Sequence, residues 1–289
     1  MDLQAALIAP AKFHQVESVL DCAMSSTPLE KPRRQHHEDP VLNRSLVRGV
    51  EILRAFRPGA DQLGNGEIAE RTQLSRATVS RLTKTLVESG LLEHDRDRRT
   101  YRLAAPVLSL AHAMRAGSPV LGVVAPLMRA LAETMRINVG LATADRDEMV
   151  YLESVRYNRK VALRNVVAGQ RVPMELTSLG RAYLAVVDGA QRRALLAQFR
   201  QRRSADWHRL REEIDAAKLS VDAKGYCAAT WQPEVVALAA PLVLPGRPIY
   251  VLNVSVTTTA DISAVEKQLS GPLLALCEKA KTALLTADR

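Results

Sequence analysis

Residues 74–92 read LSRATVSRLTKTLVESGLL, and this stretch decides the fold we expect for the N-terminal part of the chain. Ser75 can cap a helix that ends at Gly90. On a wheel of 100° per residue, one arc of this helix is apolar and carries Val79, Leu82 and Leu86. The opposite arc carries Ala77, Ser80, Arg81 and Lys84. We therefore expect a helix that packs on one side and presents a small, cationic surface on the other.

That second surface has the residue types that a helix needs in the major groove of DNA. Small side chains allow close approach, arginine reads guanine edges, and cations, hydroxyls and a helix N-terminus hold phosphates. An ordinary solvent face interleaves both signs of charge, whereas the acid of this helix is Glu88, in its last turn. The candidate DNA-binding residues of the helix are Ser75, Arg76, Ala77, Thr78, Ser80, Arg81, Lys84 and Thr85.

The neighbouring segments complete a DNA-binding module. Upstream, NRSLVRGVEILRAF predicts a helix with Leu46, Val50 and Leu53 inward and with Ile52 and Phe56 widening the stripe, and GEIAERTQL predicts a short second helix. Downstream, segments 91–94 and 100–103 flank a charged turn and predict a β-hairpin. This order is that of a winged helix-turn-helix. The wing adds Arg96, Arg98 and Arg99 as candidate DNA contacts.

Composition agrees with a polyanionic partner without proving one. The 289 residues carry a net charge of +9, and aromatic residues are only 4%, which disfavours a single-strand binder that stacks bases. The three cysteines are far apart, which favours a reducing cytosol and argues against a disulfide framework. We see no apolar run of about 18 residues and no signal peptide, since Asp2 stands where positive charge is expected. We expect a cytoplasmic, nucleoid-associated protein.

The first 42 residues predict a flexible leader, because prolines and clustered charge fill residues 25–40. The run 36–39, His-His-Glu-Asp, could bind a metal, but we favour a solvated linker because no further ligands stand at a useful spacing. No metal or other cofactor is expected.

The rest of the chain predicts an α+β domain. Residues 104–117 suggest a linker helix, and helices alternate with strand pairs from residue 118 onward. One strand pair surrounds the turn at 145–148, KVALRNVV is strand-like, and TSLGRAYLAVV is a helix with Thr177 as its cap. Residues 235–256 are rich in strand formers, and 261–286 form a last helix. Paired strands favour an antiparallel or mixed sheet.

These segments together resemble the IclR family of bacterial transcriptional regulators. SLVRGVEILRAF and GEIAERTQLSRATVSRLTKTLVESGLLEHDRDRRTYRL resemble its DNA-binding domain, and VYLESV, VAGQRVPMELTSLGRAYLA, KGYCA and ALAAPLVLPGRPIYVLNVSV follow in the order of its effector domain. The resemblance covers about residues 44–285 and implies a winged helix-turn-helix, a linker helix and a GAF-like effector domain with an antiparallel sheet. It also implies homodimers, often paired into tetramers. We expect the divisions 1–42, 43–103, 104–117 and 118–289.

The resemblance places a small-molecule pocket between the sheet and the TSLG segment. Its expected lining residues are Val161, Arg164, Val172, Ser178, Leu179, Gly180, Ala237, Asn253 and Ser255. The start of the helix at 178–180 and Arg164 could hold a carboxylate, although Arg164 could equally face solvent. Ala237 stands where many members have cysteine, and Trp231 could stack on an aromatic ligand or belong to the core. We expect an organic-acid effector, with an aromatic acid as one option.

Two other classes stay open at the sequence level. The enzyme alternative has little support, because the common nucleophile, phosphate-loop, zinc and dinucleotide motifs are absent from the sequence, and the pair Glu212–Glu213 points in two directions on a helix. The other alternative is a winged-helix adaptor that contacts proteins instead of DNA. Loss of DNA affinity on replacing Arg81 and Lys84 distinguishes a DNA-binding regulator from that adaptor.

Overall fold

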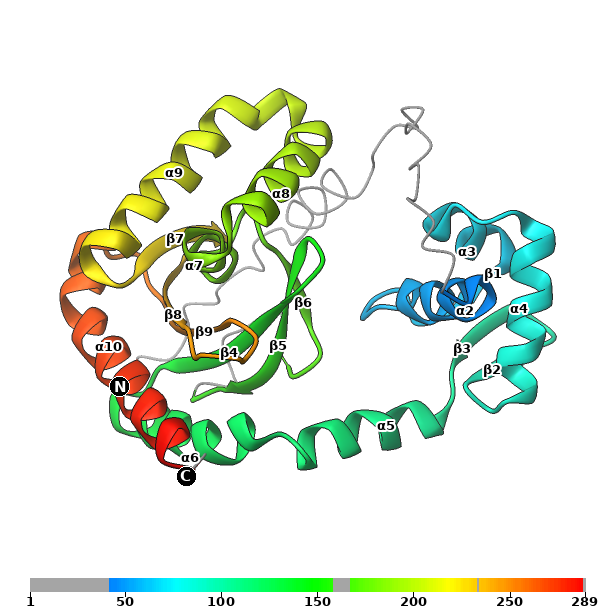
Figure 1. Cartoon of the computed structure of the whole chain (residues 1–289), viewed down its shortest axis with the longest axis horizontal. Helices are drawn as coiled ribbons and strands as arrows, with labels where there is room; N and C mark the ends of the chain where they lie inside the picture. The colour runs from blue at the N-terminus through cyan, green and yellow to red at the C-terminus, as the bar shows by residue number, and fades with distance from the viewer. Residues whose placement is uncertain (1–41, 158–166, 233, 288–289) are drawn as a thin grey trace, which may run out of the picture.

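The computed structural model describes residues 42–157, 167–232 and 234–287. An N-terminal unit and a larger unit lie at opposite ends of a single connecting helix, α5 (Ala105–Ala116) (Figure 1). The leader, apart from Leu42, and most of KVALRNVV lie outside the described residues.

The N-terminal unit is a helix-turn-helix with a small antiparallel sheet. Its elements are α2 (Arg44–Ala55), β1 (Leu63–Gly64), α3 (Asn65–Thr72), α4 (Arg76–Glu88), β2 (Leu92–Asp95) and β3 (Thr100–Leu103). The sheet has the order β1-β3-β2. Ile52, Ile68, Val79 and Leu92 meet in its core with Leu63 of β1 and Tyr101 of β3, so each of the six elements contributes an apolar residue to the packing.

The cap predicted at Ser75 is confirmed, and Asn43 caps α2 in the same way. The Asn43 side chain accepts a hydrogen bond from Leu46 N at 3.1 Å, and Ser75 Oγ accepts one from Thr78 N at 3.2 Å. After α4 the chain turns at Gly90 with φ +72°, a left-handed conformation that favours glycine.

The predicted inward face of α2 is wrong for Leu46 and Val50, whereas Ile52 and Phe56 are buried as expected and Leu53 packs against the core. Leu46 is 67% exposed and Val50 is also exposed, whereas Gly49, Ile52 and Ala55 are buried. Apolar residues occur on two sides of this helix, so periodicity alone could not tell which side faces the core.

The larger unit is built on a six-stranded sheet in the order β6-β5-β4-β9-β8-β7, antiparallel throughout. Its strands are β4 (Asn138–Asp145), β5 (Glu148–Val155), β6 (Arg171–Pro173), β7 (Cys227–Gln232), β8 (Val235–Leu242) and β9 (Tyr250–Thr257). Its helices are α6 (Pro119–Met135), α7 (Ser178–Val186), α8 (Gly189–Arg202), the 3-10 turn η1 (Ser204–Asp206), α9 (Trp207–Lys224) and α10 (Ile262–Ala287).

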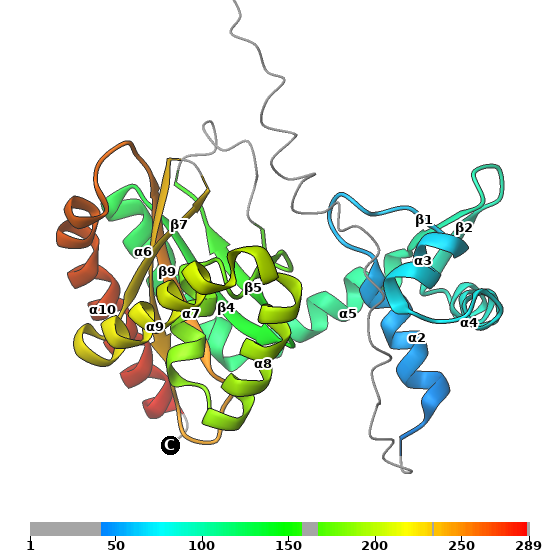
Figure 2. The same ribbon diagram turned by 90° about the horizontal axis from the view of Figure 1, so that it is seen from above.

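Helices cover both faces of this sheet (Figures 1 and 2). One face packs against α6 and α10 through an apolar cluster that includes Val124, Leu141 and Leu273. The other face packs against α7, α8 and α9. The fold is therefore the expected α+β arrangement: a winged helix-turn-helix, a linker helix and an effector-type domain with an antiparallel sheet.

Within the described residues, no single helix has the length and apolar character of a membrane span. The linker α5 and helix α6 have the length and apolar composition of a span only when they are taken together, and an 80° bend separates the two helices.

Candidate functional site

The cationic face of α4 is exposed. Val79 and Thr83 are fully buried against α2 and α3, and Thr83 Oγ1 donates to Val79 O at 2.9 Å. The side chains that face solvent are Ser75, Arg76, Ala77, Ser80, Arg81, Lys84 and Thr85, and Thr78 is partly buried. The structure therefore places the predicted contact residues together on one accessible surface.

The charge of this face is available to a ligand. Lys84 Nζ lies 3.9 Å from a Glu88 carboxylate oxygen, and its side chain is 79% exposed. A pair this long and this exposed contributes little, so Lys84 can turn toward a phosphate at small cost.

The wing carries the second group of cations. Asp95 Oδ1 accepts hydrogen bonds from the backbone N–H groups of Asp97 and Arg98 at 3.1 and 3.0 Å, which shapes the turn between β2 and β3. Arg96, Arg98 and Arg99 are exposed around this turn. Figures 1 and 2 place α4 and the hairpin on the side of the N-terminal unit that faces away from the larger unit.

The predicted effector residues lie on the face of the large sheet that packs against α7. Ser255 on β9 pairs across strands with Ala237 on β8, and Asn253, two residues before Ser255 on β9, pairs with Ala239. Val172 and Leu179 belong to the apolar cluster on the same face. Val161 and Arg164 lie outside the described residues.

Sequence reasoning missed Gly140 and Tyr151 at this face. Gly140 pairs with Asn253, and a Cβ at Gly140 would lie 2.3 Å from Asn253 Oδ1 and 2.5 Å from Tyr151 Cε1. Burial raises the pKa of the Tyr151 hydroxyl to about 12. A hydrogen bond with the Asn253 side chain lowers this pKa by a smaller amount. Asn253 Oδ1 has no hydrogen-bond partner among the described residues, which leaves a buried acceptor facing α7. The inward position of Tyr151 in VYLESV was the available signal.

The start of α7 is capped by a side chain and buried. Thr177 Oγ1 caps the helix by accepting a hydrogen bond from Gly180 N at 3.3 Å, so this N–H is already used. Ser178, Leu179 and Gly180 are all buried. The expected carboxylate site at 178–180 is thereby reduced to the N–H groups of Ser178 and Leu179.

Cys227 on β7 packs in the apolar cluster between the sheet and α7. Cys227 is buried, and its Sγ lies 3.4 Å from Ser178 O. Burial raises the pKa of its thiol to about 12, against a lowering by Arg181. A thiol in this state is a poor nucleophile. Among the described residues, no group of three histidine, cysteine or acidic side chains is arranged to hold a metal.

Two surface grooves lie apart from the predicted effector residues. One of about 280 Å³ is lined by residues of α7, α9, β7 and the start of α10, and one of about 370 Å³ lies by the β7–β8 turn. The first is bordered by Arg181 and Cys227, whose side chains are already engaged with Glu213 and Ser178.

An exposed cationic helix and wing, joined by a linker helix to a sheet domain with a buried polar acceptor, define a winged helix-turn-helix regulator with an effector domain. Comparison with known proteins agrees. The model of the IclR helix-turn-helix domain matches residues 45–96, and the model of the bacterial transcriptional regulator IclR C-terminal domain matches residues 112–280. The chain belongs to the IclR family of transcriptional regulators.

Individual relatives show the same architecture. The HTH-type transcriptional regulator TsaQ1/TsaQ2 of Comamonas testosteroni is 32% identical over 202 residues, which is 70% of this chain and 72% of its own. The crystal structure of an IclR family regulator from Brucella abortus superposes with a TM-score of 0.78 and 32% identity over 87% of this chain and 96% of that one. An IclR homolog from Microbacterium hydrocarbonoxydans complexed with 4-hydroxybenzoate has a TM-score of 0.61 at 22% identity, over 84% of this chain and 99% of its own.

Proposed function

We propose that this regulator binds operator DNA as a homodimer through α4 and the β2–β3 wing, and that an aromatic organic acid in the effector domain changes its affinity for DNA. The observation that carries the DNA part is the exposed, nearly acid-free face of α4, with the arginine-rich hairpin on the same side of the unit. Arg81 would read a base edge, and Lys84 and the wing arginines would contact phosphates.

The effector part rests on the α7 face of the sheet. Asn253 Oδ1 offers a buried acceptor to a ligand hydroxyl, and a ligand ring would take the place that the Tyr151 ring occupies beside Gly140. A ring with one hydroxyl and one carboxylate suits this face. The Microbacterium hydrocarbonoxydans homolog was crystallised with a compound of this class, 4-hydroxybenzoate.

The homodimer is proposed from apolar side chains that the single chain leaves uncovered. Leu46 and Val50 on α2 and Leu108, Leu110 and Met114 on α5 are exposed. Exposed apolar residues that gather along helices often mark an interface, and a dimer would place two α4 helices on two half-sites. We also propose that two dimers can pair and that the protein is cytoplasmic. We propose that its domains are residues 43–103, 104–117 and 118–289. We propose no catalytic role.

The test compares Arg81→Ala and Lys84→Ala on genomic fragments that the full-length protein selects by footprinting. Lys84→Ala is expected to weaken binding to all fragments and to reduce the salt dependence by about one counterion. Arg81→Ala is expected to cost about 1–3 kcal/mol at the selected sites and to relax their specificity.

Arg193→Ala is the matched control, since Arg193 is an exposed arginine on α8. Unchanged binding by both α4 variants would support the protein-contacting adaptor instead.

A further inference from the structure

The two units of the chain meet outside α5 through charged side chains. The buried apolar clusters stay separate: one lies within residues 52–101, and the other two lie within residues 120–284. No apolar cluster of the described residues therefore locks the units together, and such units are expected to reorient. What fixes their orientation must be polar.

Three ion pairs join α2 to the hairpin turn between β4 and β5. Arg54 lies 3.2 Å from Asp145, and Arg57, just after α2, donates to Glu148 Oε1 at 2.8 Å. In the third pair, Arg146 donates two hydrogen bonds to the Glu51 carboxylate, one of them at 2.7 Å. Each of the three pairs thus joins a cation of one unit to an acid of the other. We call these six residues the interdomain latch.

The turn itself supports a role for Arg146. Asp145 pairs with Glu148, so Arg146 and Asp147 form a two-residue hairpin loop. Arg146 has φ +61°, in the left-handed region where glycine or asparagine is favoured. The Arg146 side chain reaches Glu51, a contact that glycine at this position could not make.

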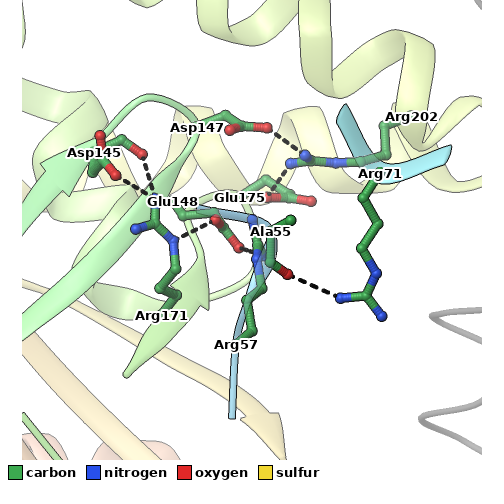
Figure 3. A network of polar contacts seen from close by, with 9 residues as sticks. All are labelled: Ala55, Arg57, Arg71, Asp145, Asp147, Glu148, Arg171, Glu175 and Arg202. Carbon is green, nitrogen blue, oxygen red and sulfur yellow. Dashed lines mark hydrogen bonds and ion pairs between the residues drawn. The ribbon is translucent and has the colours of Figure 1, made fainter. Parts of the chain in front are cut away.

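The acids of the latch are also held from inside the effector domain. Arg171 on β6 donates to Asp145 Oδ2 at 2.5 Å and to Glu148 Oε2 at 2.8 Å (Figure 3). Burial tends to raise the pKa of Asp145, but the hydrogen bond and charge of Arg171, with smaller contributions from Arg54 and Arg146, lower it overall. The Asp145 carboxylate therefore stays ionised. The hydrogen bonds from Arg171 hold both Asp145 and Glu148 in place for their partners Arg54 and Arg57.

The same turn connects to the start of α7. Asp147 accepts a hydrogen bond from Arg202 at 2.5 Å, and Arg202 also donates to Glu175 at 3.0 Å (Figure 3). Arg203 donates to the other oxygen of Glu175 at 3.2 Å, and Glu175 is fully buried two residues before the Thr177 cap. A displacement of the segment that carries Glu175 would thus move Arg202 and, through Arg202, the β4–β5 turn.

We propose that the interdomain latch holds the DNA-binding unit in one orientation against the effector domain, with Glu175 as its anchor beside α7. The latched orientation leaves the cationic face of α4 exposed, so it presents that face to DNA instead of blocking it. The latch governs the orientation of the units whether or not DNA or an effector is present, so it does not depend on the proposed function.

The latch is reversible because its arginines are half exposed: Arg54, Arg57 and Arg146 keep 39%, 47% and 50% of their side-chain surface. Each such pair is weak and is screened by salt. Three of them acting together would shift the ratio of latched to unlatched chains by roughly tenfold.

The test measures the distance between the units in the full-length protein by pulsed electron paramagnetic resonance. Spin labels are placed at the exposed positions Glu70→Cys on α3 and Leu219→Cys on α9, in a Cys22→Ser background. Cys227 and Cys277 are buried and should stay unlabelled. Labelled chains are diluted with unlabelled ones, so that each distance lies within one chain.

One narrow distance is expected at low salt, with broadening at 1 M NaCl. Arg146→Glu and Glu51→Arg should each broaden the distribution, and the double variant should restore it, because the pair is re-formed with its signs exchanged. Arg146→Gly separates the latch from folding: it should broaden the distribution while the hairpin turn becomes less strained and the melting temperature does not fall.

Arg193→Glu controls for a charge reversal elsewhere and should leave the distance unchanged. A distribution that stays narrow in Arg146→Glu and in Arg146→Gly, or a double variant as broad as the single ones, would overturn the latch. Neither outcome bears on whether α4 binds DNA.

Discussion

Gly180 shows how a single residue constrains the effector domain. A Cβ at this position would lie 2.0 Å from Met174 O and 2.3 Å from Met174 Cα, both of them backbone atoms. Gly180→Ala must therefore displace the segment that carries Glu175 and the Thr177 cap. We expect a loss of about 3 kcal/mol or more in the free energy of unfolding, measured by urea denaturation.

Gly122 on α6 is the matched control, because a Cβ there meets nothing within 4 Å and the position is exposed. Gly122→Ala should stabilise the protein by about 0.5–1 kcal/mol. Similar effects of the two substitutions would contradict the close approach seen at Gly180.

At the scale of elements, Ser75 combines two roles that one substitution can separate. It caps α4 through Thr78 N, and it lies at the end of the helix that we propose faces DNA phosphates. Ser75→Asp keeps the capping oxygen and adds a negative charge beside the helix N-terminus, so stability should be unchanged or slightly higher. The same charge would repel phosphate, so DNA affinity should fall.

Ser75→Ala provides the comparison. It removes the cap, at a cost of about 1 kcal/mol in stability. Thermal melts and DNA titrations of both variants separate the two roles. An aspartate variant that binds DNA as well as the wild type would place the end of α4 away from the phosphates.

The predictable elements were those whose signal is local. The sequence predicted α4 and α7 with their caps, and the β4–β5 hairpin, because each has its own periodicity, cap or turn. It did not predict β1 and β6, which span two and three residues and exist only by pairing with β3 and β5. Helix α8 was missed because charged residues surround its few buried positions, Leu195, Leu196 and Phe199.

The same limit applies to the site. The cationic face of α4 follows from one helix and could be predicted from it. The contact of Tyr151, Gly140 and Asn253 depends on the register between β5, β4 and β9, and the latch depends on residues about 90 positions apart in the chain. A local pattern cannot specify either arrangement.

At the scale of the whole molecule, the linker helix α5 is the element least explained by a single chain. It has no buried residue, and Leu108 on it is 75% exposed. Leu110 and Met114, one turn apart, form an exposed apolar strip along α5. Packing this strip against a second copy of the chain would bury it from water and so stabilise the pair. The proposed homodimer therefore depends on this strip, as well as on the exposed residues of α2.

Replacing both residues, Leu110→Glu with Met114→Glu, should convert the dimer to a monomer in sedimentation velocity experiments, because four like charges would be buried together at a two-fold interface. DNA affinity should fall by on the order of a hundredfold, since the two half-sites would no longer be bound by one particle. His112→Glu is the matched control, because this exposed residue lies on another side of α5. A double variant that still sediments as a dimer would show that the two chains associate through another surface and that the apolar strip of α5 has a different partner.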